Sequence, residues 1–573
     1  MLYPQSNTFR QVNDLSGFWQ FCFDAAETGL ENGFDNGRFI AVPASWNEIF
    51  EDDRDNLGPG WYQTRFQLPW GYAGKRIQIR FGSVNYLADV WLNGRYLGQH
   101  EGGHLPFTFD VTESVQADEN LLVVRVDGQL AFDRVPSGNI TGADTDFFPS
   151  HSGNYPQAQF DFFPFCGIQR PVLLTAVPHL SIADITVTTE IAGADGIVKV
   201  AVETDGSGEV DINLSGFDKE VVGAVDMDGK TAVATLTVPQ AKFWSPDAPN
   251  LYDLAVTLHE NNQVIDSYTL PVGIRTIVVQ GSQLLLNGEP IYLTGFGRHE
   301  DFPIHGRGFN PAVIIKDYAL MKWIGANSFR TTHYPYSDEM MMLADKLGFL
   351  IIDEIPAVGL YFREDGLERR LELCRQQISE LIARDKNHPS VIMWSIANEP
   401  HSEHDNAVPF FQNLAGLTRE LDDTRPVTLV SFLGLPEESF AFLDAICLNR
   451  YLGWYSEPGR IEDGTALLST DLDAIHQKYG KPIIITEFGA DTIPGMHAQP
   501  PEMFSEEYQV AYLTQTIDIL RSKPYVVGEH VWNMCDFKTS QGITRVGGLN
   551  HKGVFTRDRR PKMAAHALRE IWR

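Results

Sequence analysis

Two glutamates stand at the ends of buried β-strand patterns, where each could do acid–base or nucleophilic chemistry. Residues 391–397 form an apolar run that continues into Asn398 and Glu399 before a proline stops it. Residues 482–489 have the same shape, with an isoleucine-rich run that ends in Glu487. Paired carboxyl groups carry out glycoside hydrolysis, in which one attacks the anomeric carbon and the other protonates the leaving oxygen. We therefore expect the two glutamates to act together on a glycosidic bond.

The hydrophobic pattern beyond residue 276 alternates between short strands and helices, which is typical of a (β/α)₈ barrel. Strands are expected at residues 291–295, 328–332, 349–353, 391–397, 427–431, 445–449, 483–487 and 526–532. Helices are expected at residues 310–326, 337–347, 367–387, 409–422, 472–479, 505–523 and 561–572. On this pattern Glu399 ends the fourth strand and Glu487 the seventh. The carboxyl ends of barrel strands meet at one rim, so the two side chains should face each other there.

Polar and charged residues also gather at the other expected strand ends. They occupy residues 297–301, 330–334, 353–354, 449–451 and 532–533. Any one of them alone would more often pair with a neighbour than do chemistry. Together at one rim, they favour an active site over a barrel that serves only as a scaffold.

The first part of the chain lacks helical periodicity and shows short alternating runs between turn residues. Strands are expected at residues 62–68, 77–81, 88–92, 121–126 and 171–177, then at 182–189, 197–203, 210–214, 230–238, 251–258 and 263–272. Asn93-Gly94 is a strong two-residue hairpin signal. We predict a multidomain β plus α/β protein with a jelly-roll β-sandwich (residues 1–180), an immunoglobulin-like β-sandwich (181–275) and a C-terminal (β/α)₈ TIM barrel (276–573).

Composition narrows the possible partners and the compartment. The formal net charge of −30 over 573 residues argues against nucleic acid and against anionic membranes. The five cysteines are scattered without a CxxC pair, which favours free thiols in a reducing compartment. The first fourteen residues are polar and show no signal peptide, and no apolar run is long enough to span a membrane. We expect a cytoplasmic protein.

The motifs at the two glutamates resemble a known family. WSIANEP (residues 394–400) and IIITEFG (483–489) are similar to the acid/base and nucleophile signatures of glycoside hydrolase family 2, and the chain resembles its β-glucuronidases over essentially the whole length. The resemblance implies a retaining mechanism with Glu399 as acid/base and Glu487 as nucleophile, and Asn398 contacting the sugar 2-hydroxyl group. It also implies a homo-oligomer, a tetramer or dimer. Arg330 is a candidate to keep Glu487 ionised, and proximity of the two like charges should raise the pKa of the acid.

The choice of sugar depends on a short basic motif. Asn550-His551-Lys552 resembles the Asn-x-Lys motif of glucuronidases, which grips the C6 carboxylate of the sugar. An ammonium and an amide donor suit a carboxylate, and a chain of net charge −30 needs a local cation to hold an anion. The alternative is a solvated lysine beside the basic stretch at residues 557–562, but the flanking residues match the family as well. Leu549 reads as a one-residue insertion close to Arg545.

The resemblance adds further substrate-binding residues. They are Asp161, His333, Asn449, Tyr451, Tyr455, Trp532 and Arg545. Asp161 belongs to an aromatic run, residues 161–165, which packs as a buried corner or reaches a neighbouring site. Phe160 stands where some relatives have histidine, so that side of the pocket should be more apolar. The connection at residues 355–366 is short compared with the loop of some gut bacterial relatives, so we expect an open site that admits bulky glucuronides.

The implied activity is release of terminal β-D-glucuronic acid from small-molecule or oligosaccharide glucuronides through a covalent glycosyl-enzyme intermediate. A β-galacturonidase or β-galactosidase on the same scaffold is the main alternative, since galacturonide differs only at C4. A non-catalytic carbohydrate-binding protein is a more remote one, because both carboxyl groups are present. No HExxH motif occurs, and a two-carboxylate mechanism needs neither metal nor cofactor.

Overall fold

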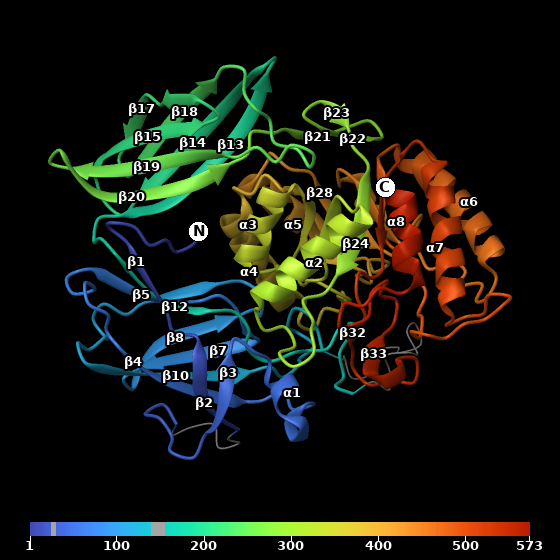
Figure 1. Cartoon of the computed structure of the whole chain (residues 1–573), viewed down its shortest axis with the longest axis horizontal. Helices are drawn as coiled ribbons and strands as arrows, with labels where there is room; N and C mark the ends of the chain where they lie inside the picture. The colour runs from blue at the N-terminus through green and yellow to red at the C-terminus, as the bar shows by residue number, and fades with distance from the viewer. Residues whose placement is uncertain (24–29, 139–154) are drawn as a thin grey trace.

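A computed structural model describes residues 1–23, 30–138 and 155–573 of the chain. Two β-sandwiches and a barrel follow one another along the sequence (Figure 1), so the predicted fold class is confirmed. The blue N-terminal sandwich and the green second sandwich lie on one side of the barrel, whose helices run from yellow to red. Among the described residues, no helix is both long and apolar enough to cross a bilayer.

The N-terminal sandwich consists of a four-stranded and a six-stranded antiparallel sheet, in the orders β1-β12-β5-β9 and β3-β2-β4-β10-β7-β8. Its strands are β1 (Gln11–Asp14), β2 (Gly17–Phe23), β3 (Arg38–Val42), β4 (Gly60–Gln67), β5 (Arg76–Phe81), β7 (Leu87–Leu92), β8 (Arg95–Glu101), β9 (Phe107–Asp110), β10 (Glu119–Asp127) and β12 (Val172–Val177). Two short strands, β6 (Val84–Asn85) and β11 (Gly167–Ile168), pair separately, and α1 (Trp46–Ile49) and η1 (Glu51–Asp53) follow β3.

The predicted hairpin in this sandwich is present. Leu92 pairs with Arg95 across the turn, and Asn93 and Gly94 have φ values of 53° and 78°. Both turn residues are therefore left-handed, which the primed two-residue turn requires and which Asn-Gly tolerates. In the strand before it, every second residue is buried against the facing sheet, as the alternation in the sequence predicts.

The second sandwich packs two four-stranded sheets, in the orders β13-β14-β18-β17 and β16-β15-β19-β20. Its strands are β13 (Ile182–Ala192), β14 (Asp195–Thr204), β15 (Glu209–Gly216), β16 (Lys219–Val222), β17 (Val225–Asp228), β18 (Thr231–Val238), β19 (Tyr252–Glu260) and β20 (Gln263–Val272). The two short strands β16 and β17 were not predicted. Each has only four residues, too few for a period-2 pattern to stand out.

Eight parallel strands close into the predicted barrel. They are β24 (Leu293–Arg298), β25 (Ser328–Thr331), β26 (Leu350–Glu354), β27 (Val391–Asn398), β28 (Val427–Ser431), β29 (Ile446–Asn449), β30 (Ile483–Glu487) and β31 (Val526–Val531). The surrounding helices are α2 (Pro311–Ile324), α3 (Asp338–Leu347), α4 (Leu367–Asp385), α5 (Ala407–Leu421), α6 (Ile461–Tyr479), α7 (Glu506–Arg521) and α8 (Met563–Trp572). Between β28 and β29 the chain makes only a short turn, η3 (Glu438–Ala441), where no helix was expected.

Local sequence signals fix where the barrel helices begin and end. The Asn310 side chain accepts the Ala312 amide at 3.0 Å at the start of α2, and the Ser505 hydroxyl group accepts the Tyr508 amide at 3.2 Å at the start of α7. Such bonds satisfy amides that have no partner within the helix. Gly325 ends α2 with a φ of 96°, which a side chain would oppose.

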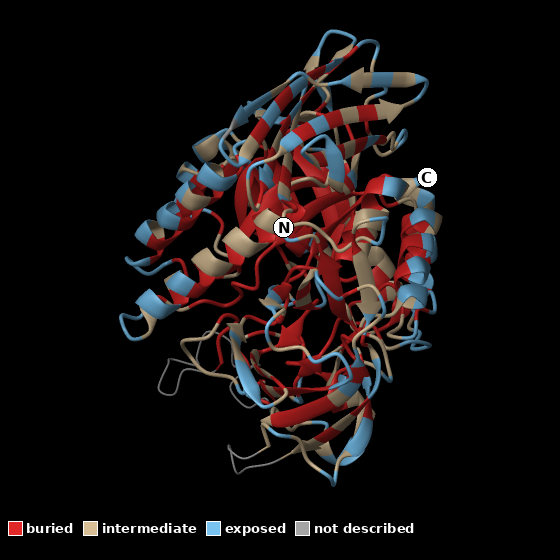
Figure 2. Ribbon diagram, turned by 90° about the vertical axis from the view of Figure 1, so that its left-hand side faces the viewer, coloured by how far each residue is buried: buried red, intermediate tan, exposed pale blue. Residues whose placement is uncertain are grey.

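A small sheet closes the end of the barrel opposite the catalytic rim and was not predicted. Its strands are β21 (Ile277–Gln280), β22 (Gln283–Leu286) and β23 (Glu289–Pro290). Ile277, Leu284 and Leu286 form one buried cluster with strand residues such as Ile352 and Ile484. Figure 2 shows the buried residues concentrated along the strands, with exposed positions on the outer faces of the helices. The sheet therefore covers the end of the barrel at which the strands begin, and the end at which they finish remains available for a site.

The N-terminal sandwich is fastened to the barrel rim by buried ion pairs. Arg80 donates to Asp338 at 3.0 Å, and Arg170 donates to Glu300 at 3.1 Å. Phe162 belongs to the hydrophobic core of the barrel even though it comes from the sandwich. The aromatic run at residues 161–165 is therefore both a buried corner and a segment that reaches the rim.

Candidate active site

Glu487 ends β30 among donors that hold both of its oxygens. The Tyr451 hydroxyl group, from the loop after β29, donates to Oε2 at 2.7 Å. The guanidinium group of Arg330 donates to Oε1, and His333 Nε2 lies 3.7 Å from the same atom. Glu487 is 4% exposed, so its carboxyl group is held in one orientation at the rim. This arrangement suits a nucleophile.

Arg330 is the central cation of the rim floor. It lies next to the last residue of β25, is fully buried and joins Glu487 to Glu354, to which Nη1 donates at 2.7 Å. The same nitrogen lies 3.3 Å from Asn398 Oδ1 and fixes which way that amide points. Ser395 donates to the second oxygen of Glu354 at 2.7 Å, so the buried carboxylate is satisfied on both sides. Arg330 was expected beside Glu487, whereas its pairing with Glu354 was not.

Glu399 follows β27 in a backbone conformation that its side chain opposes. Its φ is 46°, and its amide donates to the carbonyl oxygen of Val430 at 2.8 Å. Residues held in the left-handed region cluster at functional sites, where the surrounding structure imposes the strain. Asn449 Nδ2 donates to Glu399 Oε1 at 2.7 Å, and Thr486 orients Asn449 with a bond of 2.9 Å. Glu399 has no direct bond to a cation among the described residues.

The pKa values of both glutamates are raised, and the main cause is burial rather than like-charge repulsion. Burial raises the pKa of Glu487 to about 8, with Arg330 and Tyr451 opposing and Glu399 adding to the rise. Burial also raises the pKa of Glu399, where the Asn449 amide is the main opposing contact. The carboxyl groups titrate as a pair. The guanidinium group of Arg330 bonds directly to Glu487 and not to Glu399, which favours the ionised form of Glu487 against the effect of burial.

Aromatic and imidazole rings form one wall beside the glutamates. His333 stacks on Trp532 with ring centroids 5.1 Å apart, and Nδ1 lies 3.0 Å from Glu354 Oε1. Burial lowers the pKa of His333 well below its usual value, so the ring is neutral. Phe162 and His299 pack against this pair, with centroids 6.0 Å and 5.6 Å from His333. Phe160 stacks on Phe162 within the barrel core and supports the wall from behind.

Lys552 lies in a second cluster beside the glutamates. Its ammonium group bonds to Asp491 and to the Tyr455 hydroxyl group, the latter at 2.9 Å. The rings of Tyr455 and Trp454 lie 4.7 Å and 5.4 Å from the nitrogen. Lys552 is 1% exposed, which excludes the solvated lysine that the basic stretch suggested as an alternative.

Arg545, Asn550 and Asp161 complete this cluster. Asp161 accepts two bonds from Arg545, at 2.7 and 2.9 Å, and one from Asn550 Nδ2 at 2.7 Å. Arg545 also reaches the Tyr455 hydroxyl group at 3.2 Å. Leu549 lies in a short ladder, in which β33 (Leu549–Asn550) pairs with β32 (Phe537–Lys538). Arg545 lies beside the other residues of the cluster.

All the predicted site residues come to one rim. One group surrounds the glutamates and contains Asn398, His333, Asn449, Tyr451 and Trp532. The other is the acid-recognition cluster, which contains Asp161, Tyr455, Arg545, Asn550 and Lys552. Their contacts agree with the roles expected of them, and the roles themselves stay predictions.

Two carboxylates of the site were not among the predicted site residues, although Glu354 was counted among the polar strand ends. Asp491, in the loop after β30, pairs with Lys552, accepts the His551 amide at 2.9 Å and lies 3.7 Å from Arg545. Glu354 holds Arg330. Asp491 follows the nucleophile motif by four residues, and that short spacing was the available signal. In the described part of the chain, no group of three or more His, Cys, Asp or Glu side chains could hold a metal ion.

The site has the groups needed to cleave a glycosidic bond in a substrate that carries an acidic group. One carboxyl group is held by a cation and a phenol, the other by a neutral amide, and cations stand to one side. This is the asymmetry that a nucleophile and an acid/base require.

Comparison with known proteins places the chain in a family. The model for the family 2 glycosyl hydrolase TIM barrel domain matches residues 277–573, that for the sugar binding domain 12–178, and a third family 2 model 180–275. The chain is 42% identical to a β-glucuronidase of Paenibacillus borealis over 100% of its own length and 98% of the relative's. It is 40% identical to the β-glucuronidase of Sus scrofa over 100% of its own length and 92% of the relative's.

Solved structures agree with these sequence relatives. The β-glucuronidase of Ruminococcus gnavus, solved in complex with D-glucuronic acid, superposes with a TM-score of 0.93 at 38% identity and covers 100% of this chain and 99% of its own. The β-D-glucuronidase of Dictyoglomus thermophilum gives a TM-score of 0.91 at 40% identity, with 100% and 98% covered. The chain therefore belongs to glycoside hydrolase family 2.

Proposed function

We propose that the chain is a retaining β-glucuronidase that releases terminal β-D-glucuronic acid from glucuronides. The observation that carries the proposal is the position of Lys552, Asn550 and Arg545 beside the Glu399–Glu487 pair. The family members described above are β-glucuronidases, and one of them was solved with D-glucuronic acid. This agreement supports an acidic sugar rather than a neutral one.

In the first step, Glu487 attacks the anomeric carbon while Glu399 gives its proton to the glycosidic oxygen. The carbon–oxygen bond breaks, the aglycone leaves as an alcohol, and the sugar stays bound to Glu487 as an ester. In the second step, Glu399, now ionised, takes a proton from water, whose oxygen attacks the same carbon and frees Glu487. Tyr451 and Arg330 stabilise the carboxylate before attack and after release.

The acid-recognition cluster binds the C6 carboxylate. The ammonium group of Lys552 and the amide of Asn550 donate to it, and Arg545 adds a second positive charge next to them. Asp491 and Asp161 already pair with these cations, so the cluster is close to neutral without substrate. The substrate carboxylate gains hydrogen bonds that are already oriented, and a buried cation is never left alone.

A panel of aryl β-glycosides tests the proposal directly. Glucuronide, galacturonide, galactoside and glucoside with one common aryl group differ only at C4 and C6. We expect turnover of the glucuronide to exceed that of both neutral sugars by at least about a hundredfold, the scale set by leaving buried polar groups unpaired. Faster turnover of the galacturonide would favour the alternative acid sugar, and faster turnover of a galactoside would contradict the role of the cluster.

We further propose that the short connection at residues 355–366, between β26 and α4, leaves the site open to bulky aglycones. Tyr361 from this connection stacks on His401 with centroids 4.1 Å apart and bonds to Gln159 at 3.2 Å. An oligosaccharide ending in glucuronic acid should be turned over better, relative to an aryl glucuronide, than by relatives with a long loop. An equal or lower ratio would contradict this. From the five free cysteines we also propose a cytoplasmic protein. By resemblance we propose a homo-oligomer, a tetramer or dimer, which light scattering can test.

A further inference from the structure

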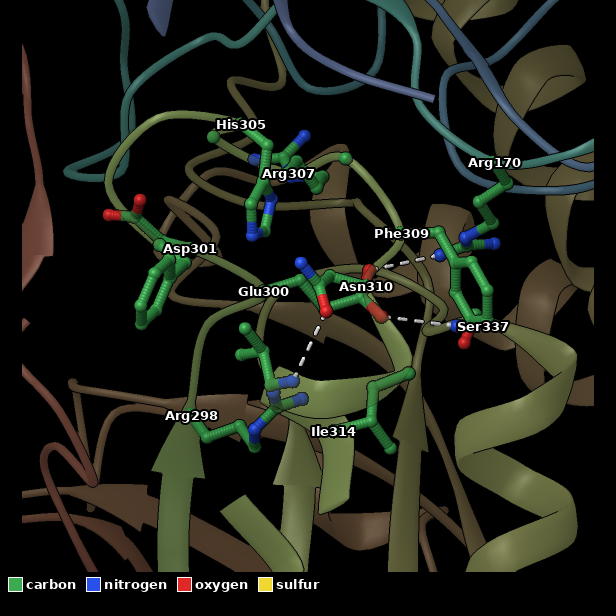
Figure 3. A pocket seen from close by; sticks show the side chains of 14 residues that line it. Arg170, Arg298, Glu300, Asp301, His305, Arg307, Phe309, Asn310, Ile314 and Ser337 are labelled. Atoms are coloured by element: carbon green, nitrogen blue, oxygen red, sulfur yellow. Dashed lines mark hydrogen bonds and ion pairs between the residues drawn. The ribbon is translucent and has the colours of Figure 1, made fainter. Parts of the chain in front are cut away.

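A small cavity lies where the N-terminal sandwich meets the barrel rim. Its volume is about 30 Å³, and its walls come from Arg170, the end of β24, the loop of residues 299–310 and the start of α3 (Figure 3). None of its lining residues belongs to the sugar site described above. The labelled side chains of His305 and Arg307 lie on one side of it and that of Arg298 on the other. The cavity is therefore a separate feature with its own chemistry.

Hydrogen-bond donors outnumber available acceptors around the cavity. Arg298 Nε and Nη1 and Arg307 Nε have no hydrogen-bond partner within the described part of the chain. Arg298 and Arg307 are only 3% and 5% exposed, so bulk water does not satisfy them. Buried donors of this kind are rarely left unpaired in native proteins. A ligand that only accepts hydrogen bonds would satisfy them.

The carboxylates in the cavity wall are already occupied. Glu300 accepts from Arg170 at 3.1 Å and from the Ser337 amide at 3.2 Å. Asp301 accepts from Arg557 Nε at 3.0 Å and from the amide of Lys538. Glu300 and Asp301 therefore accept from other donors and do not pair with the unpartnered nitrogens of Arg298 and Arg307.

Arg307 carries a positive charge that no carboxylate of the cavity wall balances. Among the described residues no carboxylate comes within ion-pair distance of it, whereas Arg170 pairs with Glu300 and Arg298 with Asp317. Its guanidinium carbon lies 4.1 Å from the ring centroid of Tyr334 and 5.4 Å from that of Phe162. Ring faces compensate a buried cation only in part, and an unpaired buried charge is costly. A counter-ion in the adjoining cavity would remove that cost.

Size limits the ligand to a small ion. A cavity of about 30 Å³ offers about two or three water positions. That is room for a halide but not for a sugar or a phosphate ester. We propose that this cavity binds a chloride-sized anion through Arg298 and Arg307. Water could accept the same hydrogen bonds, but it would leave the charge of Arg307 uncompensated.

The bound anion would fasten the sandwich to the barrel. The Arg307 amide donates to Ser45 of the sandwich at 3.2 Å, and Arg170 enters the cavity wall from the same domain. An anion held between these contacts and Arg298 of β24 neutralises the positive side of the interface. It should therefore stabilise the folded chain, because it binds the native state and not the unfolded one.

Crystals of the whole protein grown in sodium bromide test the site. Bromide scatters anomalously, and we expect one peak in the cavity within hydrogen-bonding distance of Arg298 and Arg307. The peak should be lost in Arg307→Gln and kept in Arg560→Gln, a matched change at a side chain that is 80% exposed. An unoccupied cavity, or a peak that persists in Arg307→Gln, would overturn the proposal.

Thermal unfolding gives a second readout in solution. With sodium methanesulfonate holding the ionic strength constant, chloride at thirtyfold excess over its Kd should raise Tm by about 2 °C. Ile314→Phe, which fills the cavity and keeps every charge, should abolish the rise even if Arg307→Gln fails to fold. Equal Tm values in the two salts, or a full rise in Ile314→Phe, would show that water fills the cavity.

Discussion

The catalytic floor and the acid-recognition cluster use the same residue types in opposite ways. On the floor, one arginine serves two carboxylates, Glu487 and Glu354, and a third carboxyl group, Glu399, lacks a cation. In the cluster, Lys552 and Arg545 face two carboxylates, so positive and negative charges match. The floor is short of positive charge and the cluster is balanced.

The difference follows from what each region must do. A shortage of cations on the floor favours a proton on the carboxyl pair, and the proposed mechanism requires that Glu399 carry it. A balanced cluster can admit one more carboxylate without first holding an unpaired buried charge. Substitutions on the floor should therefore change the rate and its pH dependence. Substitutions in the cluster should change the selectivity for the sugar.

Removal of the nucleophile should have the largest effect. In Glu487→Ala no glycosyl ester can form, so kcat should fall on the order of 10⁴-fold or more. Binding of D-glucuronic acid, measured by calorimetry, should persist because the cluster is intact. The exposed Glu462→Ala, on α6, is the matched control. A loss of less than tenfold would remove Glu487 from the reaction.

Replacement of the shared cation should come next. Arg330→Gln leaves Glu487 and Glu354 buried without their charge partner, which should destabilise the fold by about 3–5 kcal/mol. It should also move the acid limb of the kcat/KM profile to higher pH. Arg330 favours the ionised form of Glu487, so without it the pKa rises and activity is lost at a higher pH as the pH falls. An unchanged acid limb in folded protein would contradict the role of Arg330.

The barrel could be predicted from sequence because each strand is a short apolar run ending in polar residues. The strand at residues 427–431 and that at 483–487 have the predicted bounds. The closing sheet at residues 277–290 was missed, since its short strands precede the alternating pattern that defines the barrel. Long-range packing, not local pattern, determines that it covers the bottom of the barrel.

The site was predictable where motifs carry the chemistry and not where charges balance. Glu399, Glu487 and Lys552 stand in recognisable runs. Asp491 follows the nucleophile motif by four residues, but its partner Lys552 lies far along the chain, so only the fold shows that the two side chains meet. The sequence analysis attributed the raised pKa of the acid to the nearby like charge. The main cause at both Glu399 and Glu487 is burial, which the sequence does not show.

Loss of the cation in the cluster should change the choice of sugar more than the chemistry. Lys552→Met keeps the length of the side chain and removes the charge. We expect kcat/KM for the aryl glucuronide to fall about 10²-fold, with at most about a threefold change for the aryl glucoside. Parallel kinetics on both sugars make each variant its own control. Equal losses on the two substrates would mean that Lys552 supports the fold of the rim and does not recognise the acid.

Loss of a counter-charge should give the smallest effect and the sharpest contrast with the floor. Asp491→Asn removes the negative charge that Lys552 meets in the free protein, so the cluster gains one net positive charge. Binding of D-glucuronic acid should tighten about fivefold, since about 1 kcal/mol of repulsion between carboxylates is removed. Product inhibition should strengthen by the same factor, while the pH profile keeps its limbs because Glu399 and Glu487 are unchanged. Weaker product binding would mean that Asp491 orients Lys552 more than it neutralises it, and the cluster would then depend on positioning rather than on charge balance.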